Sequence, residues 1–477
     1  MWDDPRVKKV FAVAAAEQAL GLSGLQTFLS ESSNAAKLVL WGPSPFCLVL
    51  DMLHIRSMSG EGLVPLDLAS FRETLPAGMS PVRALKQYVH SMCGVPRFRQ
   101  RLVFVDDDVV LDDKDTLRPG EVQVVILSFC EASQAEVEAL VDAAGSGRAA
   151  AVESFLQRPQ DPDLGLVQRR FLLFHTPPVT ALFVASKHGH LEVIRLLLEA
   201  SADKDKACED GETPLLIAAE MGHLEVVRLL LESNADKDKA KQNGATPLLI
   251  AARFGHGEVA RLLLEANADK DKAEQRGVTP LLIAARYGHL EVVRLLLEAN
   301  AEKDKAGEDG ATPLFLAAEK GNMRVVRLLL ESNADKDKAK QSTTPLMVAS
   351  GNGHAEVVRL LLEANADKDK ADRSGFTPLL DAAQNGHFMV VRLLLEANAD
   401  KDKAGEDGAT PLFLAAEQGN MEVVRLLLES NADKDKAKQS TTPLMVASGK
   451  GHSEVVRLLL EANADKDKAD HSGCTLC

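Results

Sequence analysis

Seven histidines each follow a glycine, and they recur along the second half of the chain in a way that suggests a metal site. The seven are His190, His223, His256, His289, His354, His387 and His452. If each belongs to one unit of a helical stack, neighbouring rings are carried by helices about 8–10 Å apart, whereas ligands sharing Zn²⁺ lie within about 2.1 Å of the ion. Asn322 and Asn420 also replace histidine at two positions of the series. We therefore expect no metal here, and a structural histidine at a turn between helices.

A recurrent Ala-Asp-Lys-Asp-Lys-Ala segment brings alternating carboxylates together, which is a pattern related to calcium loops. An EF-hand loop needs a third oxygen ligand, then a glycine and a distant glutamate. In the segment 203–207 the fifth position is Ala207, and the alternating lysines neutralise the aspartates. We expect solvated, self-paired loops that bind neither Ca²⁺ nor nucleic acid.

Cysteine chemistry and catalytic motifs give no stronger indication of a reaction. Cys474 and Cys477 match half of a zinc site without a second half. Six cysteines in 477 residues do not form a disulfide framework, which favours a reducing compartment. The sequence has no phosphate-binding loop, nucleophile elbow or zinc-protease motif. We expect no enzyme activity, no cofactor and no small-molecule substrate.

The charge balance argues against nucleic acid and anionic membranes as partners. The chain has 55 Lys and Arg against 70 Asp and Glu, a net charge of −15, whereas both partners require a basic surface. The apolar run 11–16 ends at Glu17 and does not form a signal peptide. The run 38–50 is too short to span a bilayer. We expect a soluble protein of the cytoplasm or nucleus.

The elements that position the histidines are repeats. Thr-Pro recurs at intervals of 33 residues, with two intervals of 32, and Thr180 and Thr475 are in phase with it. The positions are Thr213, Thr246, Thr279, Thr312, Thr344, Thr377, Thr410 and Thr442. A fixed period of this length indicates a stack in which each unit buries its apolar face on the next.

The unit 213–239 predicts a turn followed by two helices. Thr213 is a suitable N-cap and Pro214 a suitable first helical residue. Gly222 ends the short first helix, because glycine adopts the left-handed conformation without strain. The second helix, 223–233, has a wide apolar face, and Asn234 tolerates the left-handed turn that follows.

In period and in its Thr-Pro-Leu signature the chain resembles the ankyrin-repeat family from about residue 136 to residue 477. Nine full repeats begin at Thr180, and a divergent first repeat with an insertion precedes them at 132–179. One departure is consistent: Leu, Phe or Met replaces the family's histidine after Thr-Pro-Leu, as at Leu216, so a hydrogen bond used by the family is expected to be absent. The resemblance implies a mainly α-helical solenoid of turn–helix–helix units, repeats over 180–473 and a truncated tenth repeat at 474–477. Because the last full repeat keeps an interior-type second helix, we expect a frayed C-terminal end.

The front of the chain differs from the repeats. Strand-like runs at 52–58, 62–68, 100–105 and 121–129 flank one helix, opened by Ser80 and Pro81 and ended by Gly94. On the helix, Val82, Leu85, Val89 and Met92 form the expected apolar face. This is an α+β pattern, and the segments 94–104 and 111–117 make 52–131 resemble the ubiquitin-like β-grasp family. The family's apolar patch then corresponds to Met58, Val103 and Val125, which are otherwise ordinary half-buried strand residues. Residues 1–51 are unassigned, either a flexible leader or an upstream extension.

The remaining candidate is a surface that binds protein. In ankyrin proteins partners bind the concave face made by turn tips and first helices. The pair before each Gly-His varies between repeats and lies at the end of that helix. The candidate protein-binding residues are Arg253, Phe254, Arg286, Tyr287, Met221 and His188. Arginines and exposed aromatics are enriched in interface hot spots, although each aromatic could instead cover the adjoining helix.

A second anomaly lies in the repeat that begins at Thr377. Asp381 replaces the aliphatic residue of other repeats, either for a polar contact or by drift. The function expected from these patterns is that of a non-catalytic scaffold or adaptor with protein partners of unknown identity. The alternative is a substrate-recognition or docking subunit of a ubiquitin-pathway enzyme assembly.

Overall fold

The computed structural model describes residues 52–56, 62–166 and 179–466 of the chain, which divide into two compact units. The first unit contains the described residues up to Ala185 together with His190–Asp203. The second contains Ser186–Gly189 and the described residues from Lys204 onward. The leader at 1–51, Met58 and the truncated repeat at 474–477 lie outside the described residues.

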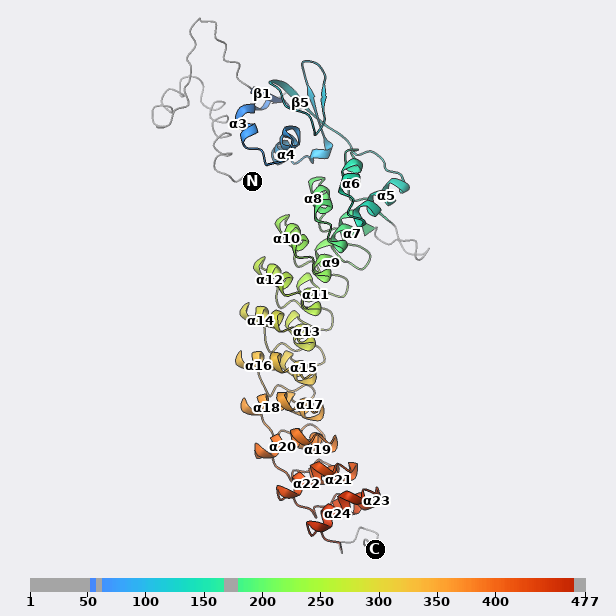
Figure 1. Ribbon diagram of the computed structural model, residues 1–477, viewed down its shortest axis with the longest axis vertical. Helices are drawn as coiled ribbons and strands as arrows, with labels where there is room; N and C mark the ends of the chain where they lie inside the picture. Colours follow the sequence, from blue (N-terminus) through green and yellow to red (C-terminus); the bar gives the residue numbers. More distant parts are fainter. Residues whose placement is uncertain (1–51, 57–61, 167–178, 467–477) are drawn as a thin grey trace, which may run out of the picture. The chain divides into compact units, whose positions relative to one another are not determined.

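The first unit begins with a mixed five-stranded sheet in the order β2-β1-β5-β3-β4 (Figure 1). β1 is parallel to β5 and antiparallel to β2, and β3 is antiparallel to both β4 and β5. The strands are β1 Met52–Arg56, β2 Gly62–Asp67, β3 Gln100–Phe104, β4 Val110–Leu111 and β5 Gly120–Ile126. The predicted α+β pattern is confirmed, with the short β4 as an addition.

The core of the sheet lies between its inner face and α4 (Pro81–Cys93), with the short α3 (Leu68–Glu73) beside it and the 3-10 turn η1 (Arg97–Arg99) leading into β3. Ser80 accepts a hydrogen bond from the backbone of Arg83, and Gly94 ends α4 with φ 71°. Val82, Leu85 and Val89 are buried as predicted. Met92 is 42% exposed, so its assignment to the apolar face was wrong: the last turn of α4 lies outside the core cluster.

Helix pairs follow the sheet. α5 (Gln134–Gly145) and α6 (Ala149–Leu156) lie where the divergent first repeat was expected, and a two-stranded ribbon, β6 (Gly165–Leu166) with β7 (Val179–Thr180), connects to α7 (Ala181–His188) and α8 (Leu191–Glu199). A capping box opens α5, because the side chain of Ser133 accepts from the backbone of Glu136, whose carboxylate accepts from the backbone of Ser133.

The second unit is a stack of further helix pairs. The first helices are α9 Pro214–Met221, α11 Pro247–Phe254, α13 Pro280–Tyr287, α15 Pro313–Glu319, α17 Pro345–Gly351, α19 Pro378–Gln384, α21 Pro411–Gln418 and α23 Pro443–Gly449. The second helices are α10 Leu224–Glu232, α12 Gly257–Glu265, α14 Leu290–Glu298, α16 Met323–Glu331, α18 Ala355–Glu363, α20 Phe388–Glu396, α22 Met421–Glu429 and α24 Ser453–Glu461.

Each pair forms for the local reasons that the sequence predicts. The hydroxyl of Thr213 accepts from the backbone of Leu216, Gly222 ends α9 with φ 74°, and Asn234 follows α10 with φ 60°. The hydrogen bond expected to be lost after Thr-Pro-Leu is partly replaced in two repeats, where the sulfurs of Met347 and Met445 accept from the backbone of the capping threonine.

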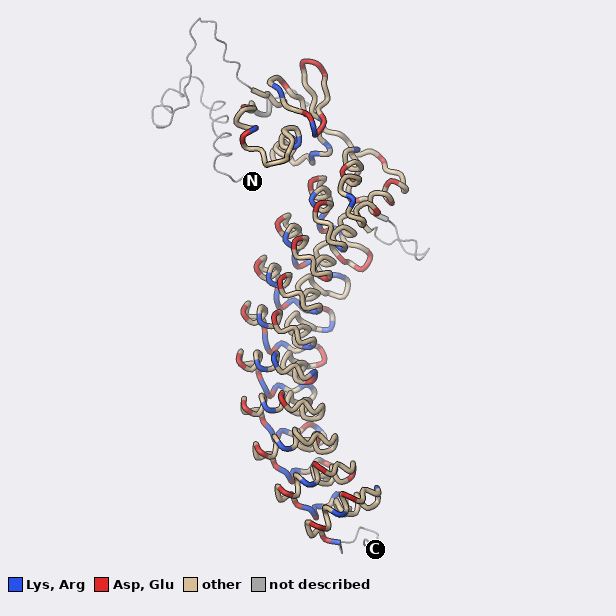
Figure 2. Tube along the Cα trace, in the orientation of Figure 1, with Lys and Arg blue, Asp and Glu red and all other residues tan. Residues whose placement is uncertain are grey.

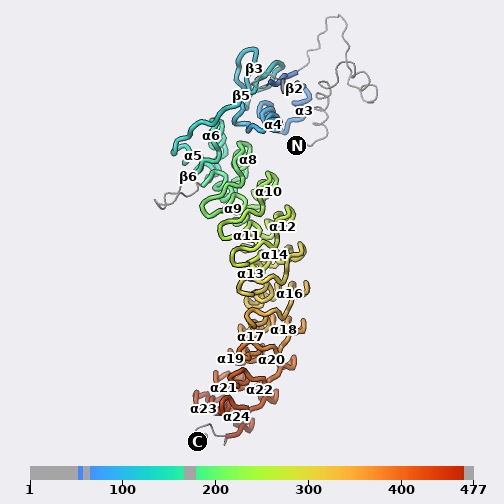
Figure 3. Tube along the Cα trace, turned by 180° about the vertical axis from the view of Figure 1, so that it is seen from behind, coloured from blue at the N-terminus to red at the C-terminus, as the bar shows by residue number. Residues whose placement is uncertain are grey.

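Within the second unit the first helices form one row and the second helices form another (Figures 1 and 3). The stack is curved, and the first helices lie on its concave side, which we call the hollow side. Small buried alanines in the first helices, such as Ala284 and Ala285, allow close packing between neighbours. The predicted ankyrin-type solenoid is confirmed. Among the described residues, no helix has the length and apolarity that crossing a membrane requires.

Candidate protein-binding surface

The first helices of three neighbouring repeats end in exposed apolar side chains. Met221, Phe254 and Tyr287 are 41%, 49% and 55% exposed and terminate α9, α11 and α13. These helices pack against one another in order (Figure 3), so the three side chains hold equivalent positions in successive repeats. We call Met221, Phe254 and Tyr287 the apolar row. Exposed apolar residues gathered in this way are typical of interaction sites.

The turn after each helix supports the aromatic rings of the row. Gly255 and Gly288 end α11 and α13 in the left-handed conformation and turn the chain toward the next histidine. The ring of Phe254 stacks on that of His256 with centroids 6.2 Å apart, and Tyr287 lies at 6.1 Å from His289. Each aromatic is thereby held by its own turn, and about half of its surface is left open to a partner.

The two predicted arginines differ in their surroundings. Arg253 is half-buried, and its guanidinium lies 3.8 Å from the carboxylate of Glu274. Arg286 is exposed, and within the described part of the chain no carboxylate pairs with it. The structure therefore separates the two: Arg253 is partly engaged and Arg286 is available. His188 is exposed at the end of α7 and continues the series one repeat before Met221.

A further cation on this side was not singled out from the sequence. Arg276 lies in the turn that leads into α13 and is exposed, again without an ion pair among the described residues. The equivalent turns before α9 and α15 carry acidic pairs, Glu209–Asp210 and Glu308–Asp309. A comparison of turn tips between repeats would have identified Arg276.

Asp381 lies half-buried on α19, where equivalent residues such as Ile250 and Leu414 are buried. Burial raises the pKa of Asp381 from 3.8 to about 7, and the nearby negative charge of Asp372 adds to the effect. Gly351 of the preceding repeat lies against this side chain. The anomaly seen in the sequence is thus a partly buried carboxylate with a raised pKa.

The sheet carries the two described residues of the expected ubiquitin-like patch. Val103 and Val125 are half-buried and alternate with the core residues Leu102 and Val124. Val103 pairs with Gln123 and Val125 with Arg101, so both valines lie on the face away from α4, diagonally across β3 and β5. Met58, the third expected member, lies outside the described residues.

The first unit also contains a buried arginine that the sequence did not reveal. The side chain of Arg97 is 1% exposed and pairs with Asp113 at 2.6 Å, Glu153 at 3.1 Å and Glu199 at 2.6 Å. Arg83 also binds Glu199, at 3.0 Å. We call Arg97 with Asp113, Glu153 and Glu199 the Arg97 cluster.

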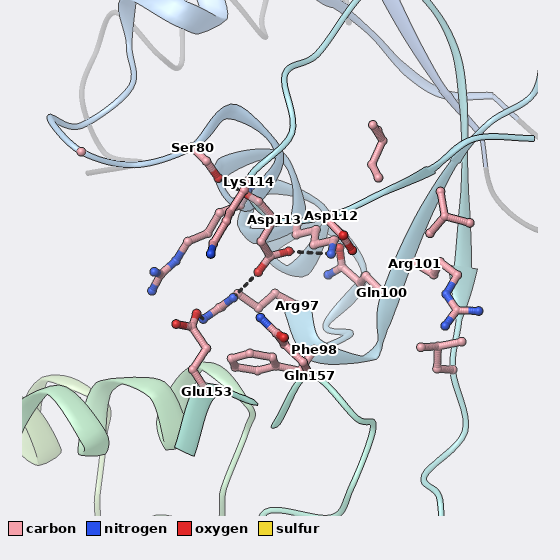
Figure 4. Close-up of a pocket in the computed structure, with 16 residues that line it drawn as sticks. Ser80, Arg97, Phe98, Gln100, Arg101, Asp112, Asp113, Lys114, Glu153 and Gln157 are labelled. Atoms are coloured by element: carbon pink, nitrogen blue, oxygen red, sulfur yellow. Dashed lines mark hydrogen bonds and ion pairs between the residues drawn. The ribbon is translucent and has the colours of Figure 1, made fainter. Parts of the chain in front are cut away.

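The Arg97 cluster borders a pocket of about 580 Å³ (Figure 4). Much of the charge that lines the pocket is already compensated, since Lys86 pairs with Asp113 at 2.6 Å in addition to the three ion pairs of Arg97. The cluster brings together residues from four distant segments. No local pattern in the sequence could have indicated it.

The histidines suspected of metal binding serve the stack instead. His256 donates through Nε2 to the backbone carbonyl of Glu220 at 2.9 Å, and His289 to that of Arg253 at 2.9 Å. Asn322 makes the equivalent bonds through Nδ2, to Ala285 and Arg286. Each ring bonds to a different carbonyl one repeat earlier, and no described group of three or more His, Cys, Asp or Glu residues has metal-binding geometry.

The acidic segments pair within each loop, as Lys270 does with Asp271 at 3.3 Å, and also form a second ladder between repeats. Asp238 accepts through Oδ1 from the backbone of Asp269 at 2.8 Å, and Asp271 likewise from Glu302. Lys272 donates to the carbonyl oxygen of Asp238 at 2.8 Å. The expectation of self-pairing was therefore incomplete, because both charged groups bond across to the neighbouring repeat. Figure 2 shows the resulting alternation of both signs of charge along the repeats.

Among the cysteines, Cys93 and Cys130 are exposed free thiols and Cys208 is half-buried. Burial raises the pKa of the Cys208 thiol. Cys474 and Cys477 lie outside the described residues, so the half-site they form in the sequence stays a prediction.

Comparison with known proteins identifies the repeats. A family model described as ankyrin repeats (3 copies) matches at 140–241, 182–274, 233–307, 299–372, 314–405 and 379–470, which together cover more than half of the chain. The crystal structure of the human ASB11 ankyrin repeat domain is similar, with 31% sequence identity over 46% of this chain and 99% of that chain, and a TM-score of 0.43. No match was found among curated proteins.

Proposed function

This chain belongs to the ankyrin-repeat family, and from that premise we propose that it is a non-catalytic adaptor that binds a protein partner on the hollow side of its second unit. Ankyrin repeats imply a role in protein–protein interaction and are typically not enzymes. The partner would lie across the first helices and the turn tips, where side chains differ between repeats while the packing residues stay the same.

The apolar row is the observation that carries this proposal. At the equivalent position the later repeats carry polar residues, such as Lys320, Asn352 and Gln418. Large apolar side chains therefore occur at this position together, in three successive repeats. Burial of a large apolar side chain contributes roughly 1.5–3 kcal/mol, so three such side chains could anchor an interface.

The test compares the full chain with the double variant Phe254→Ala and Tyr287→Ala in proximity labelling. Partners of the unchanged protein should lose labelling in the variant, because the two rings supply most of the exposed apolar area of the row. Met389→Ala is the matched control, since Met389 is 46% exposed but lies on the second helix α20. Identical partners for all three proteins would rule out the apolar row as the binding site.

The alternative is a docking role in a ubiquitin-pathway assembly, and the sheet favours it. The mixed sheet with one long helix on one face, and Val103 with Val125 on the other face, support this alternative. The test is Val103→Lys with Val125→Lys in the full chain, followed by capture of ubiquitin-pathway proteins. Specific capture that this variant abolishes would favour the alternative.

The full chain is the right material for that test. A fragment such as 52–131 would separate Arg97 from Glu153 and Glu199 and leave it with Asp113 as its one carboxylate partner. The segment boundaries at 51, 131, 179 and 473 also stay predictions. We further propose the cytoplasm or nucleus as the location, because exposed thiols such as Cys93 and Cys130 are typical of reducing compartments.

A further inference from the structure

The apolar row is accompanied by arginines in two of its three repeats. The residue that immediately precedes the member of the apolar row in the sequence is an arginine in two helices, Arg253 in α11 and Arg286 in α13. At the same position α9 and α15 carry Glu220 and Glu319. The arginines therefore occur in the same two helices that end in aromatic rings. This coincidence stands out in a protein with a net charge of −15.

The positive charge of this region is only partly compensated. Arg276 and Arg286 are exposed and have no ion pair within the described residues. Arg253 is 3.8 Å from Glu274, and its buried Nε has no hydrogen-bond acceptor among the described residues. A guanidinium has five donors in a planar fork that fits a carboxylate, so the exposed Arg276 and Arg286 keep the capacity to bind one.

The surrounding repeats carry the opposite charge on the same side. The turn before α9 presents Glu209 and Asp210, and the turn before α15 presents Glu308 and Asp309. Asp309 is held by Lys340 at 2.6 Å, which keeps the pKa of Asp309 below its usual value. A ligand with dispersed positive charge would prefer these turns, whereas one with a carboxylate is guided to the repeats of α11 and α13.

We propose that the apolar row binds a short segment of a protein partner in which an acidic side chain lies next to large apolar ones. The apolar side chains cover Met221, Phe254 and Tyr287, and the carboxylate binds Arg286 next to Tyr287, with Arg276 adding positive charge at the turn before the same helix. Because packed helices lie about 8–10 Å apart, the segment presents its apolar side chains at about that separation. This inference rests on the proposed function and adds the chemistry of the partner to it.

The experiment selects peptides from a random 16-residue library displayed on phage, with the full chain as the target. Selection on the unchanged protein should enrich Asp or Glu next to Leu, Phe or Trp. One enriched peptide is then measured by fluorescence anisotropy against Arg276→Glu with Arg286→Glu, where we expect at least about a tenfold loss of affinity. A peptide with Lys in place of its acidic residue should regain binding to that variant.

Two controls separate this inference from the proposed function. Arg294→Glu reverses a charge in the same repeat but on the second helix α14, and it should leave the affinity unchanged. Phe254→Ala with Tyr287→Ala should abolish binding. If that variant loses peptide binding while the variant of Arg276 and Arg286 binds the peptide normally, the apolar row is the binding site but the proposed contact with an acidic side chain is wrong.

The remaining outcomes are also decisive. Enrichment of basic peptides, or of none, would overturn the inference of a short acidic and apolar segment. Enriched peptides that bind equally well to the Phe254 and Tyr287 variant would count against the proposed function itself. Circular dichroism of each variant establishes that it is folded, which these exposed positions should allow.

Discussion

At the scale of single residues, the Gly-His pair joins one repeat to the one before it. The histidine Nε2 donates to a backbone carbonyl at the end of the preceding first helix, as His289 does to Arg253. The glycine is required by the same contact: a Cβ on Gly255 would lie 2.5 Å from Nδ1 of His289. Asparagine replaces histidine at Asn322 and Asn420 because its amide supplies the same donor.

Because asparagine and histidine supply the same donor, two substitutions of His289 should differ in their effect on the free energy of unfolding. His289→Asn should change the free energy of unfolding little, because the amide can reach the same carbonyl. His289→Ala should lower it by about 1 kcal/mol, the net value of a hydrogen bond. Urea denaturation of both variants measures the difference, and equal losses would show that ring packing rather than the hydrogen bond stabilises the junction.

Asp381 predicts a stability that depends on pH. Its pKa rises from 3.8 to about 7 on folding, so the folded chain keeps a proton that the unfolded chain loses between these values. The contribution of Asp381 to stability is therefore most favourable below about pH 4, falls as the pH rises, and stops falling above about pH 7. Asp381→Ile, which restores the residue found at Ile250, should stabilise the protein by roughly 2–3 kcal/mol more at pH 8 than at pH 5.

The control for that prediction is Asp381→Asn, which cannot ionise but stays polar. It should remove the pH dependence at this position while gaining less stability than Asp381→Ile. Denaturation curves at pH 5 and pH 8 for the three proteins are the measurement. A gain for Asp381→Ile that is the same at both pH values would contradict the account.

At the scale of elements, the loops after the second helices connect the repeats. Asp271 accepts from the backbone of Glu302 at 2.8 Å, and Lys305 donates to the carbonyl of Asp271 at 3.2 Å. Asn300 holds the preceding turn with φ 59°. The ladder thus satisfies backbone groups at the edge of the stack that would otherwise depend on water alone.

Removal of one of these hydrogen bonds between loops should weaken the contact between two neighbouring repeats. Asp271→Ala should lower the free energy of unfolding by about 1 kcal/mol, because the amide of Glu302 loses its acceptor. Lys303→Ala is the matched control: Lys303 belongs to the neighbouring rung, and the described structure shows no hydrogen bond or ion pair of its side chain. A similar loss in both variants would mean that the loops stabilise the stack by charge alone.

At the scale of the whole molecule, the Arg97 cluster ties the sheet to helices α6 and α8 inside the first unit. Asp113 belongs to the sheet region, whereas Glu153 and Glu199 belong to the helix pairs that follow. A buried charge with three partners is costly to expose once one partner is removed. The sheet and the first helix pairs should therefore unfold together.

Arg97→Ala tests this coupling. It should destabilise the first unit by about 3 kcal/mol, since Glu153 loses its one described cation while Asp113 and Glu199 keep only Lys86 and Arg83. It should also split its unfolding into separate transitions, visible in denaturation followed by hydrogen exchange. Arg101→Ala is the control, because Arg101 is exposed on the same sheet. A single, unchanged transition in the Arg97 variant would show that the cluster does not couple the two parts.

The last described helix should be the least protected part of the second unit. In α24, Val456 is half-buried and Leu460 is 45% exposed, whereas the equivalent Val293 of α14 is fully buried. Amides at 455–461 should therefore exchange at least about tenfold faster than those at 292–298, because among the described residues α24 packs against one neighbouring second helix, α22. Equal rates in the 477-residue chain would contradict this expectation.

The sequence alone determined the repeat, the limits of its helices and the exposed position of the apolar row. Caps, left-handed glycines and apolar periodicity act over a few residues, so Thr213, Gly222 and Asn234 could be assigned their roles without coordinates. The period then placed Phe254 and Tyr287 at equivalent positions, because equivalent residues of a stack have equivalent surroundings.

Only the tertiary structure decided which charges are paired. It joined Arg97 to carboxylates from three other segments, separated the engaged Arg253 from the available Arg286, and linked each acidic loop to the next. These outcomes depend on distances between residues far apart in the chain, which neither composition nor periodicity specifies. Ion pairs and hydrogen bonds fall off within a few ångströms, so they are fixed only when the packed helices set those distances.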